Sequence, residues 1–215
     1  MTERHAIPIS GKDSLATAII QMERQPDLQY ELFFNQTDAE LPETLTWIDK
    51  LESYFQQPII RIGDNLEDII QNYGILPSQM VRFCKKKKKI EPMERYFAGH
   101  TTYVYYGLRA DEPLRTGYAR KARNDQGAII PVYPLREEGY TLPMVYALLM
   151  SKDLLPPDHH WHTIFTMVNE QLGDRRGWLD TLHIWEKRAL FAGRSRDNCY
   201  FCFNQRMYEW IWLYD

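Results

Sequence analysis

The sequence predicts an α/β protein with a mainly parallel sheet of five strands, helices on both faces of that sheet, and a helical C-terminal cap. Three observations predict this class. Short apolar segments alternate with segments whose apolar residues recur at helical spacing, which is typical of parallel strands joined by helical crossovers. The strand-like segments stop near residue 135, and the pattern beyond it is helical. The length of 215 residues suits one domain with an appendage, because domains commonly hold roughly 100–200 residues.

The elements follow one another in a regular order. Between the first two strands, Leu15 to Met22 places apolar residues at helical spacing. Pro42 opens the next helix, since proline suits a first helical turn. We expect a core over residues 1–135 and a helical cap over 136–215. The strands are expected at 5–9, 30–34, 58–62, 103–108 and 128–133, a third core helix at 66–73, and later helices at 141–150, 161–172, 178–189 and 203–213.

Composition and charge exclude several classes. Lys and Arg number 26 and Asp and Glu 29, so the net charge of −3 argues against an overall basic coat for nucleic acid but permits a local basic patch. No apolar run reaches the roughly 18 residues of a membrane span. The first residues lack an apolar signal segment, so we expect a cytoplasmic protein without membrane contact. Three cysteines are too few for a disulfide framework and are expected to be free, metal-bound or reactive.

The strongest chemical signal is the segment from Ser10 to Ser14, which lies between a strand and a helix. Ser10 and Gly11 permit a tight turn, and the backbone N–H groups and positive end of the following helix can face an anion there. Lys12 adds a cation and Ser14 a hydroxyl, so the segment is suited to hold phosphate. The alternative is a plain turn in which Asp13 or Ser10 caps the helix.

This segment resembles the pyrophosphate loop of the adenine-nucleotide α-hydrolases, which include the N-type ATP pyrophosphatases and the phosphoadenosine phosphosulfate (PAPS) reductases. Their loop usually reads Ser-Gly-Gly-x-Asp-Ser, whereas this chain has Ile9 and Ser10 at the first two positions. The resemblance implies a Rossmann-like sheet with a nucleotide, ATP or PAPS, bound across the carboxyl ends of its strands. It implies a core that binds the nucleotide through Ser10, Gly11, Lys12, Asp13 and Ser14.

Further matches to this family follow in the expected order along the chain. The segment 34–44 resembles the family's Thr-Gly-x-Glu-x-Pro-Glu-Thr stretch, which implies nucleotide-binding roles for Asp38 and Glu40. The segment 107–112 resembles Gly-Ile-Arg-x-x-Glu, which implies that Arg109 binds or acts on the nucleotide. We therefore predict Lys12, Asp13, Cys84 and Arg109 as the catalytic set, with Mg²⁺ accompanying the phosphates.

The cysteines form a candidate metal or sulfur site. Cys199 and Cys202 have the two-residue spacing of a metal-binding hairpin, and Cys84 is the third thiol. Three thiolates can hold a [4Fe–4S] cluster with one iron open, and zinc would need a fourth ligand. The alternatives are a redox dithiol or unrelated buried thiols. Phe83 stands where some family members have a second cysteine, and the Glu-Cys-Gly-x-His tail of assimilatory reductases is absent from the sequence.

A run of five lysines follows Cys84 directly. Like charges repel one another, so the run reads either as a solvated turn or as a patch that steers anions toward the site. Arg115 belongs to the same candidate patch, with the alternative that Arg109 and Arg115 pair with Asp111 and Glu112. The lysines of the run are Lys85, Lys86, Lys87, Lys88 and Lys89.

The function that the residues and the resemblance favour is that of an ATP pyrophosphatase. In this interpretation, the enzyme adenylates an oxygen of a DNA phosphate or a tRNA for sulfur transfer, and a cysteine desulfurase is one plausible sulfur source. Reduction of PAPS or a related sulfonucleotide is the second hypothesis. The third is a nucleotide- or nucleic-acid-binding subunit without catalysis in a larger sulfur-transfer or defence complex. A homodimer is compatible with each of these.

Overall fold

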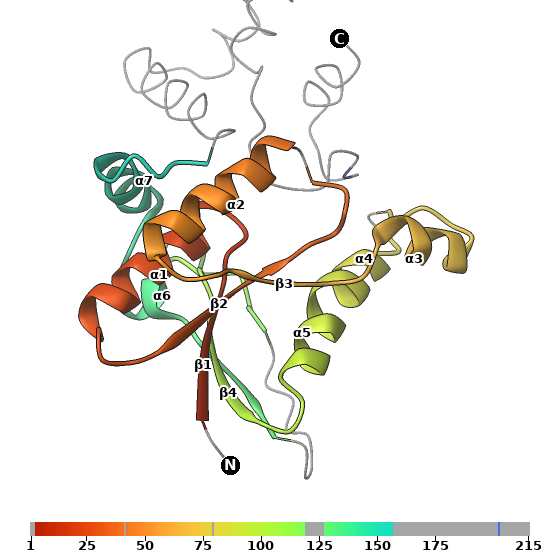
Figure 1. The fold of residues 1–215 in the computed structure, drawn as a ribbon, viewed down its shortest axis with the longest axis horizontal. Helices are drawn as coiled ribbons and strands as arrows, with labels where there is room; N and C mark the ends of the chain where they lie inside the picture. The colour runs from red at the N-terminus through yellow and green to blue at the C-terminus, as the bar shows by residue number, and fades with distance from the viewer. Residues whose placement is uncertain (1–2, 41, 79, 119–126, 157–201, 203–215) are drawn as a thin grey trace, which may run out of the picture.

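The computed structural model describes residues 3–40, 42–78, 80–118, 127–156 and 202, with the fold shown in Figure 1. The elements are β1 (Glu3–Pro8), α1 (Lys12–Arg24), β2 (Tyr30–Asn35), α2 (Pro42–Phe55), β3 (Ile60–Ile62), α3 (Leu66–Tyr73), α4 (Phe83–Lys85), the π-helix η1 (Lys86–Ile90), α5 (Glu91–Tyr96), β4 (Thr101–Tyr105), β5 (Ile129–Val132), α6 (Pro134–Glu137) and α7 (Leu142–Ser151).

The five strands form one parallel sheet in the order β3-β2-β1-β4-β5. This confirms the predicted sheet. The chain moves outward from β1 through β2 to β3 and then returns to the other side of β1 as β4. The strand order therefore reverses between β1 and β4, and ligands of open parallel sheets bind at the carboxyl ends of the strands at such a reversal.

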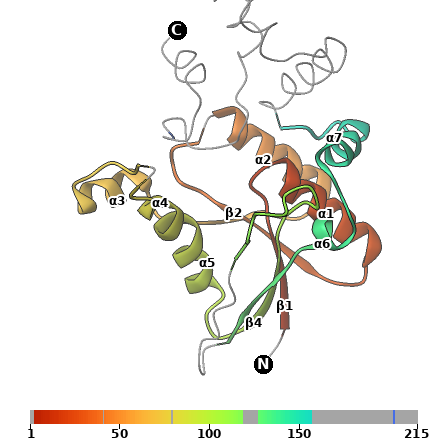
Figure 2. The same ribbon diagram turned by 180° about the vertical axis from the view of Figure 1, so that it is seen from behind.

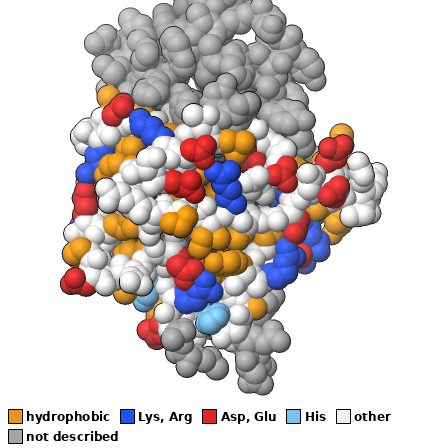
Figure 3. Space-filling model, viewed as in Figure 1, with side chains coloured by type: hydrophobic (Ala, Val, Ile, Leu, Met, Phe, Trp, Pro, Cys, Tyr) orange, Lys and Arg blue, Asp and Glu red, His pale blue; other side chains and the backbone are white. Residues whose placement is uncertain are grey.

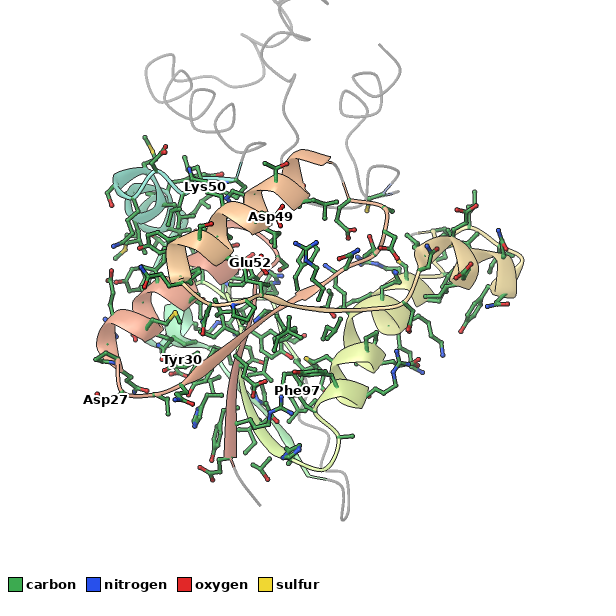
Figure 4. All side chains as sticks on the ribbon, viewed as in Figure 1. Asp27, Tyr30, Asp49, Lys50, Glu52 and Phe97 are labelled. Carbon is green, nitrogen blue, oxygen red and sulfur yellow. The ribbon has the colours of Figure 1, made fainter. Side chains whose placement is uncertain are left out.

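Helices cover both faces of the sheet, as predicted (Figures 1 and 2). Successive residues of β1 point to opposite faces, so Ile7 joins the core beneath α1, α2 and α7, whereas Ala6 joins the core beneath α5. Phe33 and Phe97 meet edge to face in the second core, with ring centroids 5.5 Å apart. Figure 4 shows Phe97 between the strands and α5.

The helical segment before β4 departs from the prediction. The sequence predicts a third core helix that ends at residue 73, and both interpretations of the lysine run place its side chains at the surface. In the structure, residues 83–96 form a continuous helical segment in which η1 has the wider π turn. Pro92 lies at the start of α5, and a proline ring displaces the carbonyl four residues earlier. That carbonyl belongs to Lys88, so the wider turn accommodates the proline.

Side chains on both sides of residue 135 are buried in one core. Leu135 of α6 and Val145 and Leu149 of α7 are fully buried in the core that α1 and α2 share. The indole N–H of Trp47 donates to the carbonyl of Leu154 at 3.3 Å. The later helices expected at 161–172, 178–189 and 203–213 lie outside the described residues. Within the described ranges, no helix is long and apolar enough to cross a bilayer.

Candidate functional site

The loop between β1 and α1 begins at the carboxyl end of the central strand. Gly11 occupies the N-cap position of α1. The Ser14 hydroxyl accepts hydrogen bonds from the amides of Ser10 (2.9 Å) and Gly11 (3.1 Å) and donates to the Gly11 carbonyl at 2.8 Å. Neither Asp13 nor Ser10 is therefore the capping residue. The amides of Lys12 and Asp13 have no acceptor one turn earlier in the helix, so they are the donors that the helix end can offer to an anion.

Asp13 lies between two cations. Its Oδ2 is 2.8 Å from Nη1 of Arg109 and 3.6 Å from Nζ of Lys12. Arg109 is 8% exposed, and its Nε also donates to Asp111 at 2.8 Å. Burial opposes the charge on Arg109, but Asp13 and Asp111 outweigh burial and raise its pKa above the usual value. The structure thus joins three predicted site residues, Lys12, Asp13 and Arg109, although they lie up to 97 positions apart in the sequence.

A backbone contact holds this ion pair in place. Gly107 follows β4, and a Cβ atom built there would lie 2.4 Å from the carbonyl carbon of Asp13 and 2.5 Å from the amide nitrogen of Ser14. Only glycine permits such an approach without displacing backbone. The loops after β1 and β4 therefore touch at the reversal of strand order, and Arg109 reaches Asp13 from the second loop.

The loop after β2 carries the other predicted nucleotide-binding residues. The amide of Thr37 donates to Oε1 of Glu40 at 2.8 Å, and the Thr37 hydroxyl donates to the same oxygen. Asp38 lies between them in the left-handed region, with φ of 56°, and is exposed. The side-chain amide of Gln36 donates to Oδ1 of Asp38 at 2.7 Å. Glu40 is thus oriented by the backbone of its own loop, whereas Asp38 faces solvent.

The lysine run divides between interior and surface. Lys88 is 2% exposed, and its ammonium donates to the Thr37 carbonyl at 3.1 Å. Lys87 and Lys86 lie 2.9 and 3.7 Å from the Glu91 carboxylate. Lys85 and Lys89 are exposed. An exposed patch could therefore include at most four of the five lysines, and Figure 3 shows charges of both signs spread over that face of the molecule.

The two predicted arginines have acidic partners, which is the alternative considered for them. Arg115 is exposed and lies 3.0 Å from Glu112, while Arg109 contacts Asp111. Nη2 of Arg136 also donates to the carbonyls of Glu112 and Arg115, at 2.7 and 2.9 Å. Arg115 thus lies on a surface loop that these hydrogen bonds hold in place. It contacts Glu112, whereas Arg109 contacts the Asp13 carboxylate.

The structure places two of the three cysteines. Cys84 and Cys202 are free and half-buried. Burial raises the pKa of the Cys84 thiol, and the negative charge of Cys202 raises it further. Cys199 lies outside the described residues. Within the described part of the chain, no three His, Cys, Asp or Glu side chains group as metal ligands.

Three polar atoms of the site lack partners. Oδ1 of Asp13, Oδ1 of Asn35 and Oε2 of Glu40 are buried and have no hydrogen-bond partner in the described part of the chain. Carboxylate and amide oxygens suit hard cations such as Mg²⁺ as well as hydrogen-bond donors. Oδ1 of Asp13 thus fits the predicted Mg²⁺, because its other oxygen already binds the two cations.

Sequence reasoning missed Gly107 and Thr37 as contributors to this site, and it placed Lys88 in an exposed run although Lys88 is buried. Gly107 and Thr37 stand within segments that resemble the family, but their roles depend on contacts with distant backbone. A glycine directly after a strand is the signal that points to a close approach. Nothing in five consecutive lysines marks the one that is buried.

The chain is similar to known proteins. A family model described as the phosphoadenosine phosphosulfate reductase domain matches residues 4–157. The chain is 29% identical over 118 residues to the adenosine 5'-phosphosulfate reductase of Allochromatium vinosum, covering 51% of this chain and 44% of that protein. It is 32% identical over 87 residues to an uncharacterized protein of Methanocaldococcus jannaschii, covering 40% and 18%.

The chain thus spans less than half the length of these two curated relatives. Among solved structures, it is similar to the phosphoadenylyl-sulfate reductase of Candida auris in a phosphate complex. That match has a TM-score of 0.49 and 16% identity, and it covers 70% of this chain and 73% of the other.

Proposed function

Because this chain belongs to the phosphoadenosine phosphosulfate reductase domain family, we propose that it binds the phosphates of an adenine nucleotide on the loop from Ser10 to Ser14 and activates that nucleotide for sulfur chemistry. The observation that carries the proposal is the joining of Lys12, Asp13 and Arg109 at the reversal of strand order. Parallel sheets bind nucleotides at this position.

Each residue has a defined task in this proposal. The amides at the start of α1 donate to phosphate oxygens, and the helix end adds partial positive charge. Lys12 neutralises phosphate charge. Arg109 holds Asp13, and Oδ1 of Asp13 is the atom that would hold Mg²⁺. When bound, Mg²⁺ would supply charge stabilisation to a pyrophosphate leaving group.

The reaction we favour is adenylation with ATP. An oxygen of a nucleic acid, either a DNA phosphate or a tRNA base, attacks the α-phosphorus, and the bond to pyrophosphate breaks. The negative charge that develops on the phosphate oxygens faces Lys12 and the first amides of α1. Preorganised donors of this kind supply much of the rate in such reactions. Asp13, which is already paired with Arg109, orients the loop without acting as a base.

The thiols of Cys84 and Cys202 would carry the sulfur step. A persulfide on one of them attacks the carbon or phosphorus that bears the adenylated oxygen, and AMP leaves with that oxygen. The neighbouring thiol then cleaves the S–S bond, which releases the sulfurated product and leaves a disulfide that an external thiol must reduce. A cysteine desulfurase is the proposed source of the persulfide sulfur. A [4Fe–4S] cluster on these thiols and Cys199 would supply instead an open iron that can bind sulfide.

Pyrophosphate release from ATP tests the favoured reaction. The wild-type protein, Lys12→Ala and the control Lys50→Ala are compared, because Lys50 is exposed on α2 and pairs with Asp153. We expect release with the wild type and Lys50→Ala and its loss in Lys12→Ala, with nucleic acid present as acceptor. Equal rates in all three proteins would place the site elsewhere. Iron and sulfide analysis after anaerobic purification tests the cluster.

Sulfonucleotide reduction is the second candidate, and the similarity to an adenosine 5'-phosphosulfate reductase favours it. A thiolate attacks the sulfur of the sulfonucleotide, and the nucleoside phosphate leaves. The second thiol then releases sulfite as a disulfide forms between Cys84 and Cys202. Sulfite release from APS or PAPS without pyrophosphate release from ATP would select this reaction. Nucleotide binding without either product would indicate a non-catalytic subunit.

A further inference from the structure

The unpartnered oxygens at the end of β2 carry an inference about which part of the nucleotide binds there. We propose that Oε2 of Glu40 accepts a hydrogen bond from a neutral donor of the nucleoside, either a ribose hydroxyl or the exocyclic amine. This proposal rests on the proposed nucleotide site and adds its specificity. Oε2 is buried and has no donor in the described part of the chain, and a buried carboxylate oxygen without a donor is costly.

The Glu40 carboxylate is fixed before any ligand arrives. Its Oε1 accepts from both the amide and the hydroxyl of Thr37. Thr37 is itself held, because its carbonyl accepts from the Lys88 ammonium at 3.1 Å and from the Leu66 amide at 3.2 Å. These bonds orient the second oxygen without using it. An oriented and unused acceptor is what a recognition site requires.

The position of this loop places it beside the phosphate loop. Pro8 of β1 pairs with Phe33 of β2, and the Ile9 amide donates to the Phe33 carbonyl at 2.7 Å. Two residues further along each segment stand Ser10 of the phosphate loop and Asn35, the last residue of β2. Asn35 carries the second unpartnered oxygen. The acceptor group and the phosphate loop therefore share one edge of the sheet.

The chemistry of the two loops sets the direction of the nucleotide. The phosphate oxygens of a nucleotide are acceptors, and a carboxylate repels them. Phosphates are therefore held on the Lys12 side. The only donors of an adenine nucleotide besides protonated phosphate are its ribose hydroxyls and its amine, which face Glu40 in this orientation. If Glu40 accepts from the 3'-hydroxyl of the ribose, the 3'-phosphate of PAPS would lie against the carboxylate and be repelled. In that case APS and ATP bind in preference to PAPS.

A cycle of variants and analogues tests the proposal. The dissociation constants of ATP, 2'-deoxy-ATP, 3'-deoxy-ATP and purine riboside triphosphate, which lacks the amine, are measured for the wild type, Glu40→Gln and the control Glu23→Gln. Glu23 is exposed near the far end of α1. We expect one analogue to bind the wild type roughly tenfold to 100-fold more weakly than ATP, since hydrogen bonds to charged groups have this worth. Glu40→Gln should weaken the binding of ATP by a similar factor and leave the dissociation constant of that analogue unchanged.

The analogue that fails identifies the donor. Weaker binding of a deoxy analogue identifies a ribose hydroxyl as the donor to Glu40. Weaker binding of purine riboside triphosphate identifies the amine. Equal binding of all four ligands by the wild type, or equal weakening of all four by Glu40→Gln, would overturn the proposal. The wild-type series needs no variant to fold. If Lys12→Ala leaves ATP binding intact, the proposed phosphate site fails instead, so the two failures are distinguishable.

Discussion

The substitution Gly107→Ala tests the contact between the two loops most directly. The added Cβ would lie 2.4 Å from the carbonyl carbon of Asp13, 2.5 Å from the Ser14 amide and 2.6 Å from the Asp13 carbonyl oxygen. All three atoms belong to backbone, and ordinary contact begins at 3.4 Å. The loops must therefore separate by about 1 Å, and overpacking of this kind costs about 1–3 kcal/mol of unfolding free energy.

Function should suffer more than stability. The displaced backbone belongs to the first turn of α1, which we propose to bind phosphate. A shift of about 1 Å in a positioning element can lower a rate roughly 100-fold. We expect Gly107→Ala to unfold at lower urea concentration and to lose most nucleotide binding and pyrophosphate release. Urea unfolding and titration with ATP measure the two effects on one preparation.

Gly74→Ala is the matched control. Gly74 ends α3 with φ of 67°, and nothing lies within 4 Å of a Cβ built there. An alanine in that conformation costs about 1 kcal/mol of stability, without touching the loop after β1. A Gly107→Ala protein with unchanged unfolding and unchanged ATP affinity would refute the close approach of the loops. A loss of ATP affinity in Gly74→Ala as well would show that the effect is not local.

Three further predictions follow from buried charges and thiols. Arg109→Met removes the nearer of the two cations that contact Asp13, and it should cost about 3 kcal/mol of unfolding free energy and lower the affinity for ATP. A stability within about 0.5 kcal/mol of the wild type in urea unfolding, as is usual for surface changes, would contradict the ion pair. Lys88→Met should lower the unfolding free energy by more than about 1 kcal/mol in the same assay, because the Thr37 carbonyl loses its buried charged donor. The control Lys89→Met changes an exposed lysine and should not destabilise the protein. Equal effects of the two substitutions would argue against burial of Lys88. Burial holds the Cys84 pKa above its ordinary value of 9.0, so alkylation of Cys84, followed by peptide mass spectrometry, should accelerate at higher pH in the native than in the urea-unfolded chain. Cys202→Ala should move the native profile to lower pH, because it removes a neighbouring negative charge, and an unmoved profile would separate the two thiols.

The sequence alone determined the layers of the core. The alternation of apolar strands with helical spacing fixed five parallel strands and their crossovers, because burying a continuous apolar strand on both faces requires helices on both sides. The run from Ser10 to Ser14 could be placed at a strand end for the same reason. The family resemblance also predicted nucleotide-binding roles for Glu40 and Arg109, although it could not say what each contacts.

Only the tertiary structure decided which of these residues act together. Strand order sets β4 beside β1, and this neighbourhood brings Gly107 against the loop after β1 and Arg109 to Asp13. Five identical lysines carry no local signal for burial, and it is the π turn before Pro92 and the position of Thr37 that select Lys88. Local sequence reports periodicity and turn chemistry over a few residues. Contacts between distant segments depend on how the strands are ordered, which a local pattern does not encode.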